Sequence, residues 1–401
     1  MAGHLSAAPQ VTQPKETKLC PTITNSRQPT RSSITGPHCS APIGIVWGAV
    51  MDKRQANRFA VVSPDLVTPR LADMEQDFIR AWIRMKGNLK LGGGVQELGY
   101  RQEKKAKDLA ADAHSRRLRQ AGMSGLSKEA KAQVTALARA GATFNGPACE
   151  DAVYQFAADL HAESPWMRDV SAWVMNQMLA HVENGGSGLA LPPVILAGPP
   201  GIGKSHFARR LAELAGTPSR LIDVGGGSAG FRITGTEKGW STAQAGIPVE
   251  TILSSHAANP VMVVDEVDKA GEMRSESGRS TSLTTALLPL LEAGTAQQFE
   301  CPFHRLPFDM SRVVWIMTAN DAVLIPAPLR DRARVFHLQD LNAEDAVDHF
   351  DRLTSHCCDQ GELDQCRAFI ARMTEAPRGI SLRQIRQLVE ALQVSSVPFG
   401  H

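Results

Sequence analysis

Short runs of apolar residues are the main pattern in the second half of the chain. The four runs cover residues 194–196, 221–224, 261–264 and 313–318. Runs of this length that are rich in β-branched residues are typical of parallel strands buried on both faces. After the first run, Phe207, Leu211 and Leu214 recur at the spacing of a helix. This alternation predicts an α/β fold with a parallel sheet flanked by helices.

A different periodicity precedes these runs, from about residue 64 to residue 182. Apolar residues recur there at intervals of three and four, as they do along one face of a helix. The first such series is Leu71, Met74, Phe78, Trp82 and Met85. Further along, Ser164 and Pro165 have the character of a helix start, a capping hydroxyl followed by proline in the first turn. The pattern therefore predicts a helical N-terminal region.

Composition separates the beginning of the chain from the rest. Residues 1–60 are rich in Pro, Ser, Thr and Gln with little periodicity, which predicts a mostly disordered tail.

The composition of the whole chain bounds its class. Its 401 residues are 43% hydrophobic, so the chain is long and apolar enough to form two or three domains. Seven cysteines without paired spacing favour a reducing cytoplasm. No apolar run approaches the roughly 20 residues of a membrane helix, so we expect a cytoplasmic protein without membrane contact.

The charge is nearly balanced, with a formal net value of +2, so it requires neither a nucleic acid nor a membrane as partner. Residues 101–140 are locally basic, with ten Lys or Arg against four Asp or Glu. Two interpretations stay open for this segment. A solvated helix face is the commoner one, and contact with nucleic acid is the other.

The first apolar run leads into the segment VILAGPPGIGKS, which fits the phosphate-loop pattern G-x-x-x-x-G-K-[ST] between a strand and a helix. The expected phosphate-binding residues are Gly198, Pro199, Pro200, Gly201, Ile202, Gly203, Lys204 and Ser205. Glycines let the backbone curl so that its N–H groups point at phosphates, and the following helix adds its dipole. Lys204 is expected to reach the β- and γ-phosphates of ATP, and Ser205 to bind Mg²⁺.

Polar residues follow the third and fourth apolar runs. Asp265 and Glu266 come directly after residues 261–264, and Asn320 follows residues 313–318. Because parallel strands end at one edge of a sheet, these side chains are expected near the phosphate loop. Asp265 would hold Mg²⁺, and Glu266 would act as general base on the attacking water. Asn320 would hydrogen-bond that water.

Five segments occur in a fixed order between residues 190 and 340: GPPGIGKS, NPVMVVDEVDK, ALLPLLE, PFDMSRVVWIMTAN and IPAPLRDRARV. Together they resemble the AAA+ ATPases, and within these the ATPase module of the Lon proteases. The resemblance implies a P-loop NTPase core with a small C-terminal helical lid. It also implies the roles of Walker A for residues 198–205, Walker B for Asp265 and Glu266, and sensor 1 for Asn320.

The resemblance further implies roles for two arginines. Arg332 matches the arginine finger that reaches the ATP of a neighbouring subunit, although Arg330 and Arg334 are close enough to compete for this assignment. Arg383 resembles the sensor 2 arginine, with Arg378 as the reserve. A finger acting between subunits implies a homo-oligomer, which in this family is a hexamer.

One aromatic residue is placed by the same resemblance. Trp240 lies between Gly235 and Gly246 at the spacing of the aromatic pore loop that grips protein substrates. A tryptophan packed into the domain's own surface is the alternative.

Lon proteases continue beyond the lid into a peptidase domain, whereas this chain stops at His401. We therefore expect a motor without its own peptidase activity, with a separate peptidase or adaptor as a possible partner.

Three classes of function follow. The first is a Lon-like motor that hydrolyses ATP to remodel or unfold protein substrates. The second is a nucleic-acid-associated AAA+ ATPase, a loader or transposition helper, and a slow regulatory nucleotide switch is a weaker third. The expected segments are a disordered tail over 1–60, a helical region with the basic segment over 61–185, an AAA+ core over 186–340 and a helical lid over 341–401.

Overall fold

The computed structural model describes residues 58–89, 98–224, 229–237, 243–269, 282–355, 360–377 and 379–395. Trp240 and Arg378 lie outside these ranges, as does all of the expected tail except residues 58–60. The pore-loop role of Trp240 and the disorder of the tail therefore stay predictions.

A five-stranded parallel sheet forms the centre of the fold. Its strands are β3 (Val194–Ala197), β4 (Ser219–Asp223), β5 (Val261–Asp265), β8 (Val314–Ala319) and β9 (Arg334–His337). Their order in the sheet is β4-β5-β8-β3-β9, and every neighbouring pair is parallel. The first four strands lie within two residues of the predicted runs, so the predicted α/β fold is confirmed.

Alternate residues of the strands pack into two separate hydrophobic clusters. In β3, Ile195 and Ala197 belong to the first cluster, and Val194 and Leu196 belong to the second. Because successive side chains of a strand point to opposite faces, each cluster covers one face of the sheet. Both faces are therefore buried, which explains why the strands are continuous apolar runs.

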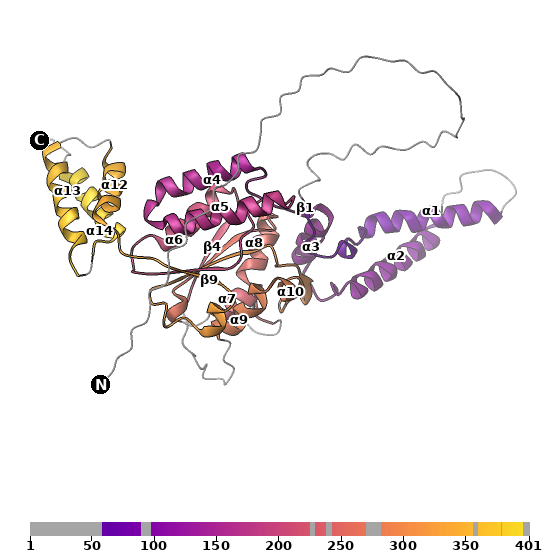
Figure 1. Ribbon diagram of the computed structural model, residues 1–401. Coiled ribbons are helices and arrows are strands. Elements are labelled where there is room, and N and C mark those ends of the chain that lie inside the picture. The colour runs from indigo at the N-terminus through magenta and orange to yellow at the C-terminus, as the bar shows by residue number, and fades with distance from the viewer. Residues whose placement is uncertain are drawn as a thin grey trace, which may run out of the picture. The chain divides into compact units, whose positions relative to one another are not determined.

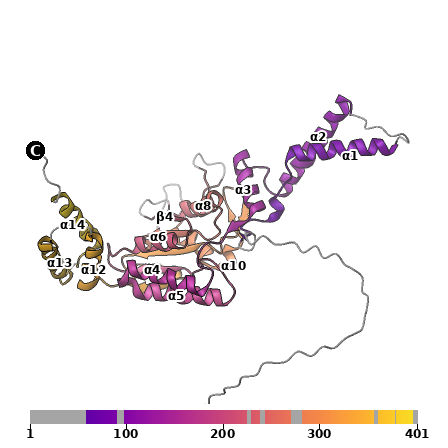
Figure 2. The ribbon, with the colours of Figure 1, turned by 90° about the horizontal axis from the view of Figure 1, so that it is seen from above.

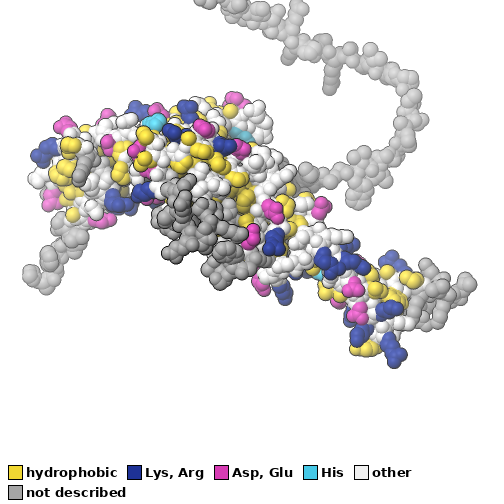
Figure 3. All heavy atoms as spheres, turned by 90° about the horizontal axis from the view of Figure 1, so that it is seen from below, with side chains coloured by type: hydrophobic (Ala, Val, Ile, Leu, Met, Phe, Trp, Pro, Cys, Tyr) yellow, Lys and Arg dark blue, Asp and Glu magenta, His cyan; other side chains and the backbone are white. Residues whose placement is uncertain are grey.

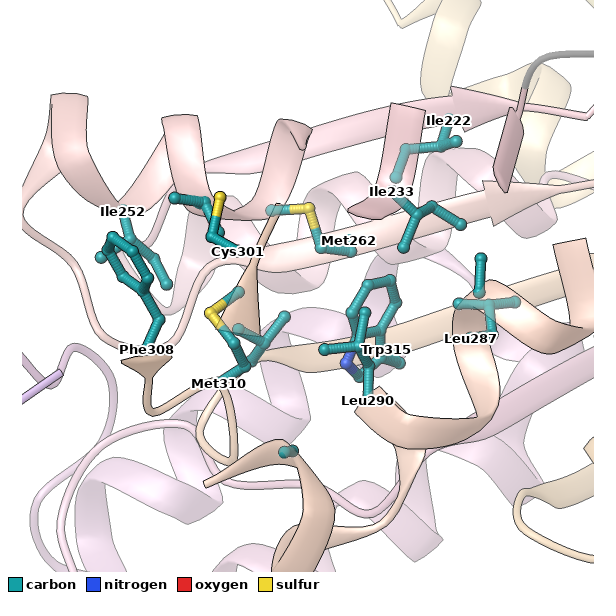
Figure 4. Close-up of a cluster of buried hydrophobic side chains, with 14 of the residues drawn as sticks. Ile222, Ile233, Ile252, Met262, Leu287, Leu290, Cys301, Phe308, Met310 and Trp315 are labelled. Carbon is teal, nitrogen blue, oxygen red and sulfur yellow. The ribbon is translucent and has the colours of Figure 1, made fainter. Parts of the chain in front are cut away.

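The first cluster fills the space between the sheet and the helices α7 (Ala229–Thr234), α8 (Ile247–Ser255) and α9 (Leu283–Leu291). In the close-up of Figure 4, Trp315 of β8 lies beside Leu287 and Leu290 of α9. Trp315 is only 1% exposed. Truncation of a side chain of this size to alanine costs about 3–5 kcal/mol, so this contact contributes strongly to the position of α9 on the sheet.

The second cluster lies under α4 (Glu150–Glu163), α5 (Arg168–Glu183) and α6 (Lys204–Leu214). Figure 1 shows α4 and α5 over one face of the sheet and α7 and α9 over the other. A 3-10 turn, Pro165–Met167, precedes α5, and the Ser164 hydroxyl makes no capping hydrogen bond. The capping role predicted for Ser164 is therefore wrong, because this turn separates its side chain from the first turn of the α-helix.

The predicted helical N-terminal region is present. Its helices before α4 are α1 (Leu71–Leu89), α2 (Tyr100–Gln120) and α3 (Lys128–Ala140). α1 packs against α2. β1 (Arg58–Phe59), which precedes α1, pairs antiparallel with β2 (Ala142–Thr143), which follows α3. Val134 and Leu137 of α3 belong to the first cluster, whereas α4 and α5 belong to the second. The region thus contributes to both faces of the sheet, and its boundaries stay a prediction.

Three helices form the small C-terminal lid: α12 (Ala343–Thr354), α13 (Gln360–Thr374) and α14 (Leu382–Ser395). Phe350, Ile370 and Ile385 are fully buried among them. The lid meets the phosphate loop directly, since the N–H of Leu382 donates to the carbonyl of Gly201 at 2.9 Å. Figure 2 shows α12, α13 and α14 grouped together, and the Arg352 side chain of α12 donates to the carbonyl of Ala162 in α4.

The remaining described elements are short. They are the helices α10 (Ala293–Ala296) and α11 (Ala327–Arg330), the hairpin of β6 (Phe299–Cys301) with β7 (Leu306–Phe308), and 3-10 turns at Pro64–Leu66 and Val267–Lys269. None of the described helices combines the length and the apolar character that crossing a bilayer would require.

Candidate functional site

A cavity of about 960 Å³ opens between the carboxyl edge of the sheet and the lid. From the core it is lined by the phosphate loop together with Asp265, Glu266, Thr318 and Asn320, and from the lid by His349, Leu382, Arg383 and Arg386. The sheet order places β8 between β5 and β3, so the ends of these three strands meet at one edge. Ligands of open parallel sheets bind at such an edge.

The glycines of the phosphate loop are required by its backbone. Gly201 and Gly203 have φ values of 83° and 92°, in the left-handed region that side chains disfavour. A Cβ atom at Gly198 would lie 2.6 Å from the carbonyl oxygen of Leu338. The loop therefore curls tightly around open space at the start of α6, which suits a polyphosphate.

Lys204 is buried at the centre of this loop, 7% exposed. Its Nζ donates to the carbonyl oxygens of Gly198 at 2.7 Å and Pro199 at 2.8 Å, and to Oδ1 of Asn320 at 3.1 Å. Burial lowers the pKa of Lys204, and the neighbouring carboxylates, Asp265 first, oppose this effect. An ammonium surrounded by uncharged oxygens fits a site where phosphate oxygens would replace some of those partners.

Ser205 and Asp265 meet as the sequence predicted. The Ser205 hydroxyl donates to Oδ1 of Asp265 at 2.9 Å. Thr318 donates to the same carboxylate oxygen and accepts the N–H of Glu266 at 3.1 Å. Hydroxyl and carboxylate oxygens are ligands that Mg²⁺ prefers, and Mg²⁺ usually takes its other ligands from water and phosphate. These residues therefore fit a magnesium ion that is bound together with a nucleotide.

Glu266 is held between two polar partners. Its Oε1 accepts from Nδ2 of Asn320 at 3.3 Å, and its Oε2 accepts from Nζ of Lys269 at 2.7 Å. The backbone of Glu266 has a φ of 60°, an uncommon value for a residue with a side chain. The Glu266 carboxylate points toward Asn320. The predicted pair of Glu266 and Asn320 is therefore brought together.

Asp268 anchors the residues that follow β8. Its Oδ2 accepts the backbone N–H groups of Asn320 and Asp321, both at 3.1 Å. Sequence reasoning missed Asp268 and Thr318. The sequence marks Asp268 only by its place close behind Asp265 and Glu266, and Thr318 only by its place at the end of the fourth apolar run.

Of the arginines considered for the site, some line the cavity and others lie outside its lining. Arg383 lines the cavity, as does Arg386, which sequence reasoning missed. Arg332 does not line it, and its Nε donates to Oε1 of Glu292 at 2.6 Å. Arg334 lies over the ring of Phe336, 5.6 Å from its centroid. Arg383 and Arg386 therefore line the cavity from the lid, whereas Arg332 lies outside its lining.

Two further residues connect the lid to the phosphate loop. Nε1 of Trp166 donates to the carbonyl of Ile202 at 2.9 Å, and the indole meets the ring of His349 edge-on at 5.6 Å. Burial lowers the pKa of His349 to about 4. The imidazole is therefore neutral at physiological pH and contributes no charge to its end of the cavity. Neither residue carried a sequence signal for this contact.

Residues 194–341 match the family model described as ATPase family associated with various cellular activities (AAA). Lon protease 4 of Sorangium cellulosum (strain So ce56) is 31% identical over 207 residues, which are 49% of this chain and 25% of that protein. The peroxisomal Lon protease homolog 2 of Caenorhabditis elegans is 29% identical over 235 residues, 56% of this chain and 29% of that protein. A closed-state cryo-EM structure of Hsp104 with ATPyS and FITC casein aligns with a TM-score of 0.46 at 16% identity, covering 71% of this chain and 50% of that chain.

The chain spans only a quarter to about three tenths of the length of these two Lon relatives. The similarity lies over the ATPase region. The chain thus contains an AAA+ ATPase module that resembles that of the Lon proteases.

Proposed function

We propose that this protein is a Lon-like AAA+ motor that hydrolyses ATP in the presence of Mg²⁺ to remodel or unfold protein substrates. The observation that supports hydrolysis best is the meeting of Ser205, Asp265, Glu266 and Asn320 around the buried Lys204. The similarity to Lon proteases supports polypeptides as the substrate.

Each residue of the site has a role in this reaction. Lys204 would exchange its carbonyl partners for β- and γ-phosphate oxygens, and Ser205 and Asp265 would hold Mg²⁺. When bound, Mg²⁺ would neutralise charge on the phosphates. Glu266 accepts the proton of the attacking water at a carboxylate oxygen, and Asn320 orients that water. The water oxygen bonds to the γ-phosphorus as the bond to the β–γ bridging oxygen breaks, which yields ADP and phosphate.

The acting form is a homo-oligomer, which we propose to be a hexamer. Arg332 lies outside the cavity of its own subunit and is 34% exposed, so a neighbouring subunit's nucleotide is a suitable partner. In this form Arg383 binds the phosphates from the lid of the same subunit. A separate peptidase or adaptor can take over the unfolded substrate.

The variant Glu266→Gln tests the base. It keeps the size and a hydrogen-bond acceptor but loses the basicity, so nucleotide affinity should be retained while kcat falls about 10²-fold or more. The exposed Glu300→Gln on β6 is the matched control and should hydrolyse ATP normally. Turnover of Glu266→Gln at the wild-type rate would contradict the assignment.

A mixing experiment tests the shared site. Oligomers made from Arg332→Ala and Glu266→Gln subunits contain some interfaces with one intact base and one intact arginine. Such mixtures should therefore regain activity that neither variant has alone, because a finger contributes on the order of 10³-fold to the rate. Full activity of a strictly monomeric protein would contradict the shared site.

A nucleic-acid-associated ATPase is the second candidate, and one surface favours it. Exposed basic residues follow one another along α2: Arg101, Lys104, Lys105, Lys107, Arg116, Arg117 and Arg119. In Figure 3, however, acidic side chains are interspersed with the basic ones over α1 and α2, and Lys107 pairs with Glu103 at 2.7 Å. Stimulation of the ATPase by DNA or RNA and not by an unfolded protein would favour this candidate.

A further inference from the structure

A carboxylate stands beside the proposed arginine finger in the same subunit. Nε of Arg332 donates to Oε1 of Glu292 at 2.6 Å, and its Nη1 donates to the carbonyl of Pro328 at 3.3 Å. Among the described residues, Nη2 of Arg332 has no hydrogen-bond partner. The two side chains are 34% and 47% exposed. The guanidinium is thus oriented through two of its nitrogens and leaves donors open to a partner at the surface.

Both members of this ion pair stand on well-anchored elements. Glu292 directly follows α9, whose Leu287 and Leu290 lie against Trp315 in the first cluster (Figure 4). Arg332 follows α11, which is anchored by the fully buried Leu329 and contacts α9. The packing of the core therefore sets the separation between the carboxylate and the guanidinium, and neither group depends on a long loop for its position.

We propose that Glu292 is a positioning residue for Arg332: it fixes the guanidinium in the orientation in which its open edge reaches the nucleotide of the neighbouring subunit. The inference rests on the proposed function, because it requires Arg332 to act across an interface. An arginine side chain has many rotamers, and fixing them before the neighbouring nucleotide arrives removes this cost from the catalytic step. Glu292 does not line the cavity, so it acts only through Arg332.

Two variants of Glu292 test the inference in the assembled protein. Glu292→Ala removes the acceptor and should lower kcat for ATP about 5- to 10-fold, with KM changed less than 2-fold, because the binding residues of the cavity are untouched. Glu292→Gln keeps an oxygen that can accept from Nε and should retain at least half of the activity. Light scattering after gel filtration should show the same oligomer for all variants.

A double variant separates positioning from a general structural effect. If Glu292 acts through Arg332, adding Glu292→Ala to Arg332→Ala should change the remaining rate by less than 2-fold. The matched control is Glu163→Ala, since Glu163 accepts from Nε of Arg210 at the same 2.6 Å, with exposures of 36% and 34%. This control should keep the wild-type kcat.

The outcomes distinguish the two levels of the proposal. A wild-type rate for Arg332→Ala would overturn the finger role and with it the inference on Glu292. Loss of activity in Arg332→Ala but not in Glu292→Ala would overturn the positioning role alone. An additional loss in the double variant would also overturn it, because Glu292 would then act independently of Arg332.

Discussion

Lowering the pH from 7.5 to 5 should weaken the folded state through one side chain, His349. Its ring lies on α12 and meets the indole of Trp166 edge-on. Burial is the main cause that lowers its pKa from 6.5 to about 4, and the nearby Arg352, His206 and Arg386 add to the effect. The folded state therefore resists a proton that the unfolded chain accepts.

The direction of the effect follows from this difference in proton binding. Above about pH 7.5 the ring is neutral in both states, so the group does not change the free energy of unfolding. As the pH falls through 6.5, only the unfolded state gains the proton, and stability decreases until the pH reaches about 4. The full difference corresponds to about 3 kcal/mol, of which about 2 kcal/mol fall between pH 7.5 and pH 5. Solvent screening at a half-buried ring reduces this to about 1 kcal/mol.

Urea unfolding at the two pH values measures the effect. The variant His349→Gln does not titrate in this range, so it should lose about 1 kcal/mol less than the wild-type protein between pH 7.5 and pH 5. The control is His161→Gln, which changes an exposed histidine of α4 and should retain the wild-type pH dependence. Equal losses in the wild-type protein and His349→Gln would refute the reasoning.

Three further predictions concern the site and the substrate. Thr318→Val removes the hydroxyl that donates to Asp265 and should lower kcat about tenfold. An unchanged steady-state rate would show that the hydrogen bond is dispensable. Gly201→Ala forces a side chain to a φ of 83°, which costs about 1–2 kcal/mol, and should weaken binding of a fluorescent ATP analogue at least fivefold, as judged by titration. Gly294→Ala, where a Cβ meets no atom within 4 Å, should bind normally, and equal affinities of the two variants would contradict the strain argument. Trp240→Ala should keep ATPase activity and assembly but lose unfolding of a tagged protein substrate, and unimpaired unfolding would shift weight to the nucleic-acid candidate.

Sequence patterns were sufficient for elements whose signal is local. β3, β5 and β8 were predicted closely because burial on both faces demands an uninterrupted apolar run. β9 was not predicted, since it lies at the edge of the sheet and none of its residues is fully buried. The phosphate loop was recognisable because its backbone needs glycine at positions of positive φ, and this requirement is visible in the sequence itself.

The tertiary structure alone decided which distant residues meet. β8 follows β5 in the chain but lies between β5 and β3 in the sheet, and this order brings Asn320 to both Lys204 and Glu266. Glu292 meets Arg332 only because α9 and α11 pack together. No local spacing encodes these contacts. They depend on strand order and helix packing, which are set by burying apolar faces that lie far apart along the chain.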